Sequence, residues 1–159
     1  MKSKESAAKD KTQNKKFMLL ALKQAAKARE IGEVPVGAVI VKNNEIISKG
    51  FNRCIKDKDP TAHAEIEALR KAAKKIGNYR LNGCDIYVTI EPCPMCAGAL
   101  VNARIRKIFF GAFDKKAGAC KSVFKITGSS KLNHRIETES GILKEDCAKI
   151  ITDFFKNKR

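Results

Sequence analysis

A chain of 159 residues is long enough to bury a hydrophobic core without disulfides or a structural metal, so we expect a single domain. Its formal net charge of +16 favours a polyanionic partner, although a lysine bias spread along the chain explains the same excess without any ligand. No segment approaches transmembrane length and no signal or transit peptide is evident, which argues against a membrane protein and predicts a cytoplasmic location.

The chain is predicted to begin with a lysine-rich tail. Residues 1–15 are mostly polar or alanine and have no apolar periodicity, so we expect them to be disordered. An amphipathic helix follows from Phe17 to about Glu30 and ends at Gly32. The predicted domain therefore comprises residues 16–159.

Five short runs have the apolar and β-branched pattern of strands. They lie at residues 35–41, 45–51, 84–90, 107–112 and 135–138. Asn43 and Asn44 separate the first two runs and predict the turn of a β-hairpin.

Helices are predicted at residues 60–76, 93–103, 119–126 and 142–158. The first of these opens on a capping signal, with Asp59 before the helix and Pro60 in its first turn. Strands separated by helices indicate an α/β fold. We expect a three-layer α/β/α sandwich with a mixed, five-stranded sheet.

Two stretches carry side chains that bind metals. They are His63-Ala64-Glu65 and Pro92-Cys93-Pro94-Met95-Cys96. One imidazole and two thiolates form a three-ligand set for a tetrahedral zinc with an open fourth position. A water in that position ionises near neutral pH and becomes a nucleophile, and Glu65 is the expected proton shuttle. The sequence therefore predicts one catalytic zinc, held by His63, Cys93 and Cys96.

Each stretch alone has a simpler interpretation. Two cysteines at this spacing can be a redox pair or small buried hydrophobes, and His-x-Glu is often only a polar helix face. Their conjunction favours zinc, because His-x-Glu followed by Pro-Cys-x-x-Cys is the signature of zinc-dependent nucleobase deaminases. The other cysteines show no paired spacing and are expected to be free thiols: Cys54, Cys84, Cys120 and Cys147.

With these motifs the chain resembles the bacterial tRNA-specific adenosine deaminases of the cytidine deaminase-like superfamily. The likeness runs from about Phe17 to Arg159. Beyond the zinc motifs it includes the stretches 33–39, 50–53, 59–62, 133–135 and 153–155.

The resemblance implies a homodimer that converts adenosine to inosine at the wobble position of a tRNA anticodon. It implies that Asn52 contacts the target nucleotide, and that Asp114, Phe154, Phe155 and Arg159 help to hold the anticodon stem-loop. The residues alone also allow Asn52 to serve in a turn, Asp114 to cap a loop and Phe154 to pack in the core.

Two other functions stay open. One is the same chemistry on free cytosine, guanine or a nucleoside, which the basic, Phe-containing last helix argues against. The other is a zinc-bearing tRNA-binding subunit without catalysis. Glu65 argues against that second function, because a purely structural site needs no acid there.

Overall fold

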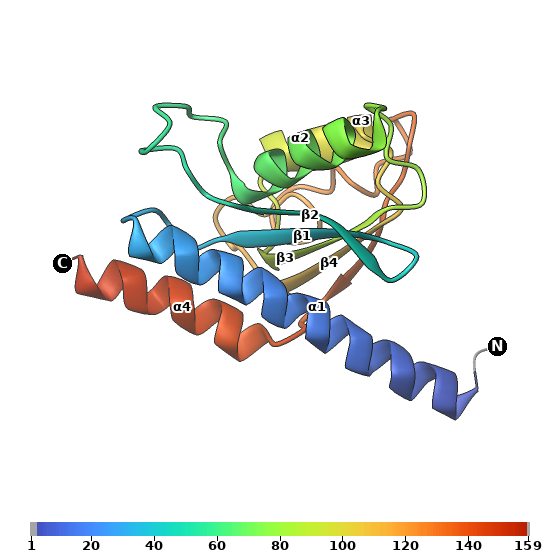
Figure 1. Ribbon diagram of the computed structural model, residues 1–159, viewed down its shortest axis with the longest axis horizontal. Coiled ribbons are helices and arrows are strands. Elements are labelled where there is room, and N and C mark those ends of the chain that lie inside the picture. The colour runs from blue at the N-terminus through green and yellow to red at the C-terminus, as the bar shows by residue number, and fades with distance from the viewer. Residues whose placement is uncertain (1–2, 159) are drawn as a thin grey trace.

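The computed structural model describes residues 3–158 of the chain. Within these residues, four helices cover a single sheet of five strands in the order β2-β1-β3-β4-β5 (Figure 1). The elements are α1 (Lys4–Glu30), β1 (Gly37–Lys42), β2 (Glu45–Phe51), α2 (Ala64–Ile76), β3 (Asp85–Ile90), α3 (Pro94–Asn102), β4 (Lys107–Ala112), β5 (Glu137–Ser140) and α4 (Lys144–Asn157).

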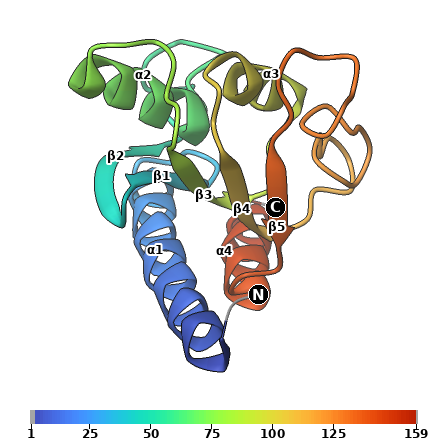
Figure 2. The ribbon, with the colours of Figure 1, turned by 90° about the vertical axis from the view of Figure 1, so that its right-hand side faces the viewer.

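The sheet is mixed, as predicted. β1 pairs antiparallel with both β2 and β3, whereas β3, β4 and β5 run parallel. The helices α1 and α4 lie on one face of the sheet, and α2 and α3 lie on the other (Figure 2). The predicted three-layer α/β/α sandwich is therefore confirmed.

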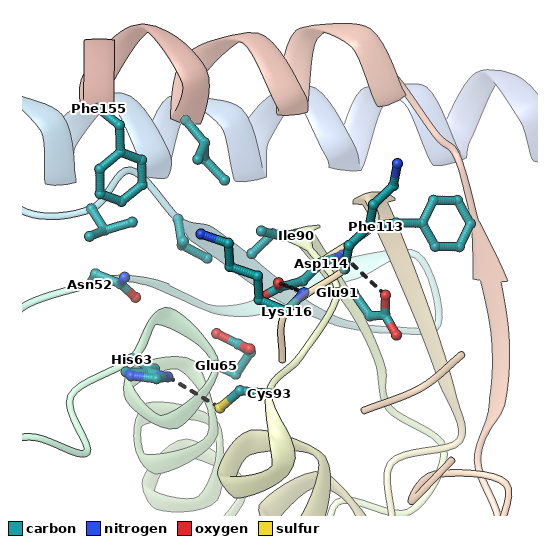
Figure 3. Close-up of a pocket in the computed structure, with 14 residues that line it drawn as sticks. Asn52, His63, Glu65, Ile90, Glu91, Cys93, Phe113, Asp114, Lys116 and Phe155 are labelled. Atoms are coloured by element: carbon teal, nitrogen blue, oxygen red, sulfur yellow. Dashed lines mark hydrogen bonds between the residues drawn. The ribbon is translucent and has the colours of Figure 1, made fainter. Parts of the chain in front are cut away.

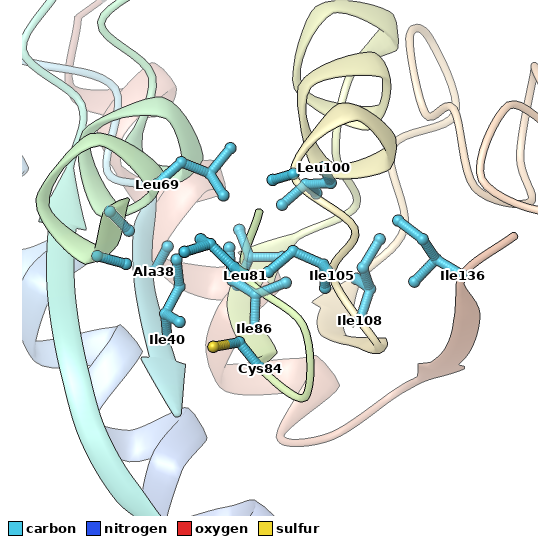
Figure 4. Packing of buried hydrophobic residues seen from close by; sticks show 14 of the residues in the cluster. Ala38, Ile40, Leu69, Leu81, Cys84, Ile86, Leu100, Ile105, Ile108 and Ile136 are labelled. Carbon is cyan, nitrogen blue, oxygen red and sulfur yellow. The ribbon is translucent and has the colours of Figure 1, made fainter. Parts of the chain in front are cut away.

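Hydrophobic side chains fill the space on both faces of the sheet. The layer under α2 and α3 includes Ile40, Ile86 and Leu100 (Figure 4). The layer under α1 and α4 includes Val39 and Tyr87. Helices cover both faces of the central strands, so neighbouring residues of β1 are buried in different layers. This is why the sequence of β1 is a continuous apolar run.

Two glycines let helices approach the sheet closely. A Cβ at Gly37 would overlap the carbonyl oxygen of Ala21 in α1, and a Cβ at Gly50 would overlap that of Ala64 in α2. Any larger residue at Gly50 would push the first turn of α2 away from β2. This glycine therefore helps to set the position of the segment that carries His63.

The predicted strands are confirmed, with boundaries that shift by no more than two residues. The hairpin turn is also confirmed. Asn43 and Asn44 have φ angles of 50° and 62°, the left-handed conformation that a two-residue type I′ hairpin requires.

The N-terminal prediction was wrong for the residues that the structure describes. α1 begins at Lys4, so residues 4–15 are helical and not a disordered tail. Ser3 caps the helix by accepting a hydrogen bond from the backbone N–H of Ser6. Asn14 anchors it, since its side-chain oxygen accepts a 2.7 Å hydrogen bond from the hydroxyl of Tyr87. A packed helix extends easily into residues of high helix propensity, even where they carry no apolar stripe.

α2 starts four residues later than predicted, at Ala64. Asp59 does not cap the helix, because its carboxylate accepts hydrogen bonds from the backbone N–H and the hydroxyl of Thr61, at 2.8 and 2.7 Å. The turn that these bonds close occupies residues that the capping signal assigned to the helix. As a result, His63 lies immediately before the helix rather than within its first turn.

The short helix predicted at 119–126 is absent from the described structure. The backbone N–H groups of Cys120, Lys121 and Ser122 donate instead to the carboxylate of Glu91, at 3.1, 2.7 and 2.9 Å. A buried carboxylate far away in the sequence therefore outcompetes local helix formation. The final helix is confirmed as α4, and none of the helices in residues 3–158 is long and apolar enough to cross a membrane.

Candidate active site

The three predicted metal ligands meet at one edge of the sheet. β3 ends at Ile90, and Cys93 is the residue just before α3, whose first turn contains Cys96. His63 occupies the corresponding place before α2. The N-termini of α2 and α3 therefore converge near the carboxyl end of β3, which is a common position for ligand sites in α/β sheets.

The spacing of the three side chains fits one metal ion. Nδ1 of His63 lies 3.6 Å from Sγ of Cys93 and 3.5 Å from Sγ of Cys96, and the three atoms lie within 4.8 Å of one another. Ligands around a tetrahedral zinc, at about 2.0 Å for nitrogen and about 2.3 Å for sulfur, stand about 3.5 Å apart. The group can hold a metal ion, and three protein ligands leave a fourth position free.

The surroundings of Cys93 favour the thiolate, which is the form that binds metals. Hydrogen bonds with Cys96 and His63 lower the pKa of Cys93 to about 4, while the same contact with Cys93 raises the pKa of Cys96. The same contact with Cys93 raises the pKa of His63. The N-terminus of α3 adds the positive end of a helix dipole beside the sulfur atoms.

Glu65 lies beside this group, in the first turn of α2, and only 3% of its surface is exposed (Figure 3). Burial raises the pKa of its carboxyl group to about 7. A carboxyl group whose pKa is close to the working pH can both accept and donate a proton. The position and environment of Glu65 therefore suit the proton transfers predicted for it.

A pocket of about 620 Å³ opens over these residues. Cys96 is fully buried behind it. The pocket collects predicted site residues from separate segments of the chain: Asn52, His63, Glu65, Cys93, Asp114 and Phe155.

Asn52, at the end of β2, is fixed by two hydrogen bonds. Its backbone N–H donates to the carbonyl of Val36, and its side-chain oxygen accepts a 2.7 Å bond from the backbone N–H of Ala64. Its amide nitrogen has no hydrogen-bond partner among residues 3–158, while the side chain lines the pocket. Asn52 thus holds the start of α2, and its amide nitrogen is an unused donor at the pocket.

Asp114 lines the pocket and also caps a turn. Its Oδ1 accepts hydrogen bonds from the backbone N–H groups of Lys116 and Ala117, at 3.0 and 3.1 Å. Its own backbone N–H donates to Oε1 of Glu91, 3.2 Å away. The capping role that the sequence allowed is therefore present, within a segment that forms part of the pocket wall.

The two adjacent phenylalanines of α4 differ in their environment. Phe154 is 8% exposed and lies in the core, whereas Phe155 is 48% exposed and lines the pocket. Figure 3 shows Phe155 on the side of the pocket opposite His63 and Cys93. Arg159, the remaining predicted substrate residue, lies outside the described residues.

Sequence reasoning missed much of the pocket wall: Val34, Val36, Ile90, Phe113, Lys115, Lys116 and Ile151. The lysine pair directly after Asp114 was the one visible signal. It also missed Glu33, whose buried carboxylate accepts hydrogen bonds from the backbone N–H groups of Ile55 and Lys56, at 3.1 and 2.9 Å. No local pattern marks such a residue, because its partners are distant in the sequence.

Comparison with known proteins agrees with this site. A family model described as MafB19-like deaminase matches residues 12–159. Together with the fold and the His/Cys/Cys group, this match defines the chain as a deaminase-type hydrolase.

The chain is 49% identical over 147 residues to the tRNA-specific adenosine deaminase of Haemophilus influenzae, covering 92% of this chain and 85% of that protein. The protein of the same name from Aquifex aeolicus is 49% identical over 143 residues, covering 90% of this chain and 94% of its relative. The chain belongs to the family of the tRNA-specific adenosine deaminases, as the resemblance predicted.

Solved structures show the same relationship. A chain from a study of A-to-I editing by tRNA:A34 deaminases at the wobble position of transfer RNA matches with a TM-score of 0.82 and 43% identity, over 84% of this chain and 97% of that one. A guanine deaminase from Nitrosomonas europaea matches with a TM-score of 0.74 but 21% identity, over 88% and 83% of the two chains. The second likeness shows the fold alone.

Proposed function

We propose that the protein hydrolytically deaminates adenosine to inosine at the wobble position of tRNA anticodons. One observation carries the proposal: in a chain of this family, Glu65 lies beside the His63, Cys93 and Cys96 group at a pocket large enough for a nucleoside. The relatives are named tRNA-specific adenosine deaminases, and one structural neighbour comes from a study of editing at the wobble position.

We propose zinc, one ion per chain, as the metal held by His63, Cys93 and Cys96. Two thiolates and an imidazole are ligands that zinc prefers, and the distances between them suit a tetrahedral ion. Bound zinc lowers the pKa of a coordinated water to near neutrality and so supplies a nucleophile.

Glu65 carries the proton transfers in this proposal. Its carboxylate accepts a proton from the attacking water and donates it to the purine ring nitrogen next to the reacting carbon. It then transfers the second proton of the attacking water to the amino group, which leaves as ammonia. Water is added and ammonia released, so no redox partner is needed. Burial suits this role, because it places the pKa of Glu65 within the range in which both protonation states are accessible.

The surrounding residues would recognise the nucleotide and its neighbours in the anticodon loop. The free amide nitrogen of Asn52 can donate to an acceptor on the target nucleotide, and the exposed ring of Phe155 can stack on a base. Asp114 would shape the wall, Phe154 would support Phe155 from the core, and Arg159 would contact a phosphate. A base paired within a duplex cannot reach Glu65, so the substrate is a base splayed out of a loop.

We further propose that the protein works as a homodimer in the cytoplasm. Exposed apolar side chains support an interface on the side of α2 and α3, where Tyr79 and Leu132 are 70% and 42% exposed and line one hollow with Val101. Sedimentation equilibrium of the purified protein tests the dimer. A monomer at micromolar concentration would exclude it.

The test of function is a comparison of substrates. Purified protein is incubated with an anticodon stem-loop that has adenosine at the wobble position, and in parallel with free adenosine, cytidine, cytosine and guanine. We expect inosine in the stem-loop and no turnover of the free compounds. Efficient turnover of a free base or nucleoside, with the stem-loop untouched, would instead make the protein a small-molecule deaminase.

A further inference from the structure

We propose that Glu91 is a positioning residue: its buried carboxylate fixes the segment 113–122, and through it the pocket wall that meets the substrate. Glu91 lies between β3 and Cys93, only two residues before that ligand. It is 1% exposed. The inference rests on the proposed function, since it assigns a role within that same site.

Five donors converge on this one carboxylate. Oε1 accepts from the backbone N–H of Asp114 at 3.2 Å and from the hydroxyl of Ser122. Oε2 accepts from the backbone N–H groups of Cys120, Lys121 and Ser122, at 3.1, 2.7 and 2.9 Å. Both ends of the segment 113–122 are therefore tied to the same side chain.

Gly118, in the middle of this segment, makes the arrangement possible. A Cβ at this position would overlap both the carboxyl group of Glu91 and the carbonyl oxygen of Asp114. The backbone N–H of Gly118 donates to that same carbonyl, at 2.9 Å, so the segment folds tightly around the carboxylate. Only a residue without a side chain allows this approach.

The segment held in this way forms a wall of the pocket. Phe113, Asp114, Lys115 and Lys116 line the cavity that also contains Glu65 (Figure 3). The lysines provide positive charge for an RNA phosphate, and Phe113 provides an apolar face. Because Glu91 is joined to Cys93 by a single residue, the carboxylate sets the distance between this wall and the metal-binding group.

The first test is Glu91→Gln, compared with Glu45→Gln at an exposed position of β2. A carboxamide has the same shape but only one acceptor oxygen, so at least two of the five donors must face its NH₂ group. We expect backbone amides of Cys120 to Ser122 to exchange faster with solvent. We expect KM for the stem-loop to rise on the order of tenfold with kcat within about threefold, because wall contacts bind substrate and transition state alike.

A second variant breaks the same contact from the other side. Gly118→Ala keeps the carboxylate but places a methyl group against it, and we expect the same rise in KM. Gly128→Ala is the matched control, because a Cβ at Gly128 has no neighbour within 4 Å and φ there is not positive. Metal content should remain equal to that of wild type in all these variants.

The outcomes decide the proposal. Faster exchange at residues 120–122 with unchanged KM and kcat would show that the segment does not position the substrate. Loss of the metal in Glu91→Gln would show a role in supporting Cys93 instead. If Glu91→Gln does not fold, Ser122→Ala, which removes only the hydroxyl donor, should still raise KM, and an unchanged KM overturns the proposal. A wild-type protein inactive on the stem-loop refutes the proposed function itself, before any variant is compared.

Discussion

The side-chain oxygen of Asn52 accepts a 2.7 Å hydrogen bond from the backbone N–H of Ala64, the first residue of α2. This bond connects the end of β2 to the residue between His63 and Glu65. It also orients the Asn52 amide, so that the acceptor is occupied within the protein and the donor faces the pocket.

This relationship predicts different effects for two substitutions. Asn52→Asp keeps an acceptor for Ala64 but loses the donor, so we expect near-normal thermal stability and a large loss of stem-loop binding. Asn52→Ala loses both and should also be less stable, by about 1–3 kcal/mol, because a backbone N–H is left unsatisfied. Stem-loop affinity and melting temperature are measured for both. Normal affinity in Asn52→Asp would mean that Asn52 only supports the helix.

Removal of a metal ligand should remove the metal and the activity together. We expect Cys93→Ser and Cys96→Ser to contain well under one equivalent of zinc and to lose deamination, since an alcohol is a poor ligand for zinc. Metal analysis after purification without added zinc provides the measurement. Cys54→Ser, at a half-buried cysteine outside the group, is the matched control and should behave like wild type.

Glu65→Gln should separate metal binding from proton transfer. The substitution preserves shape, so we expect normal zinc content and a fall in kcat of roughly two to four powers of ten. Glu67→Gln, two residues further along α2, serves as the control. A rate for Glu65→Gln close to that of wild type would show that another group moves the protons.

The two phenylalanines of α4 should respond in opposite ways. Phe154 is 8% exposed, so Phe154→Ala should destabilise the fold by about 3–5 kcal/mol. Phe155 is 48% exposed and lines the pocket, so Phe155→Ala should change stability little and weaken stem-loop binding. Denaturant melts and stem-loop titrations of both variants are compared. A core role for Phe155 would instead appear as a large loss of stability.

Two buried thiols should resist alkylation in the folded protein. Burial raises the pKa of Cys120 and Cys147 to about 12 in each case. At pH 8 both thiols therefore stay protonated, and the thiolate that reacts with iodoacetamide is scarce. Mass spectrometry should find them unlabelled in the native protein and labelled in denaturant. Rapid labelling of Cys147 without unfolding would contradict its burial.

Local patterns in the sequence determined a large part of this protein. Alternation and β-branched runs located every strand, and the hairpin turn at Asn43 and Asn44 has the conformation that its residues favour. The metal-binding group was predictable because His63, Cys93 and Cys96 belong to a short sequence signature, although α2 begins four residues later than its capping signal indicated. These patterns depend on neighbouring residues, so the strands and the turn that they predict are present in the folded chain.

Tertiary contacts decided what those patterns left open or mispredicted. Residues 119–126 form no helix because the Glu91 carboxylate, from the end of another strand, takes their N–H groups. Phe154 and Phe155 are identical in type, and only the packing of α4 on the sheet sends one into the core and the other into the pocket. In both cases the deciding contact joins segments far apart in the chain. Its energy depends on the folded geometry, which no local pattern encodes.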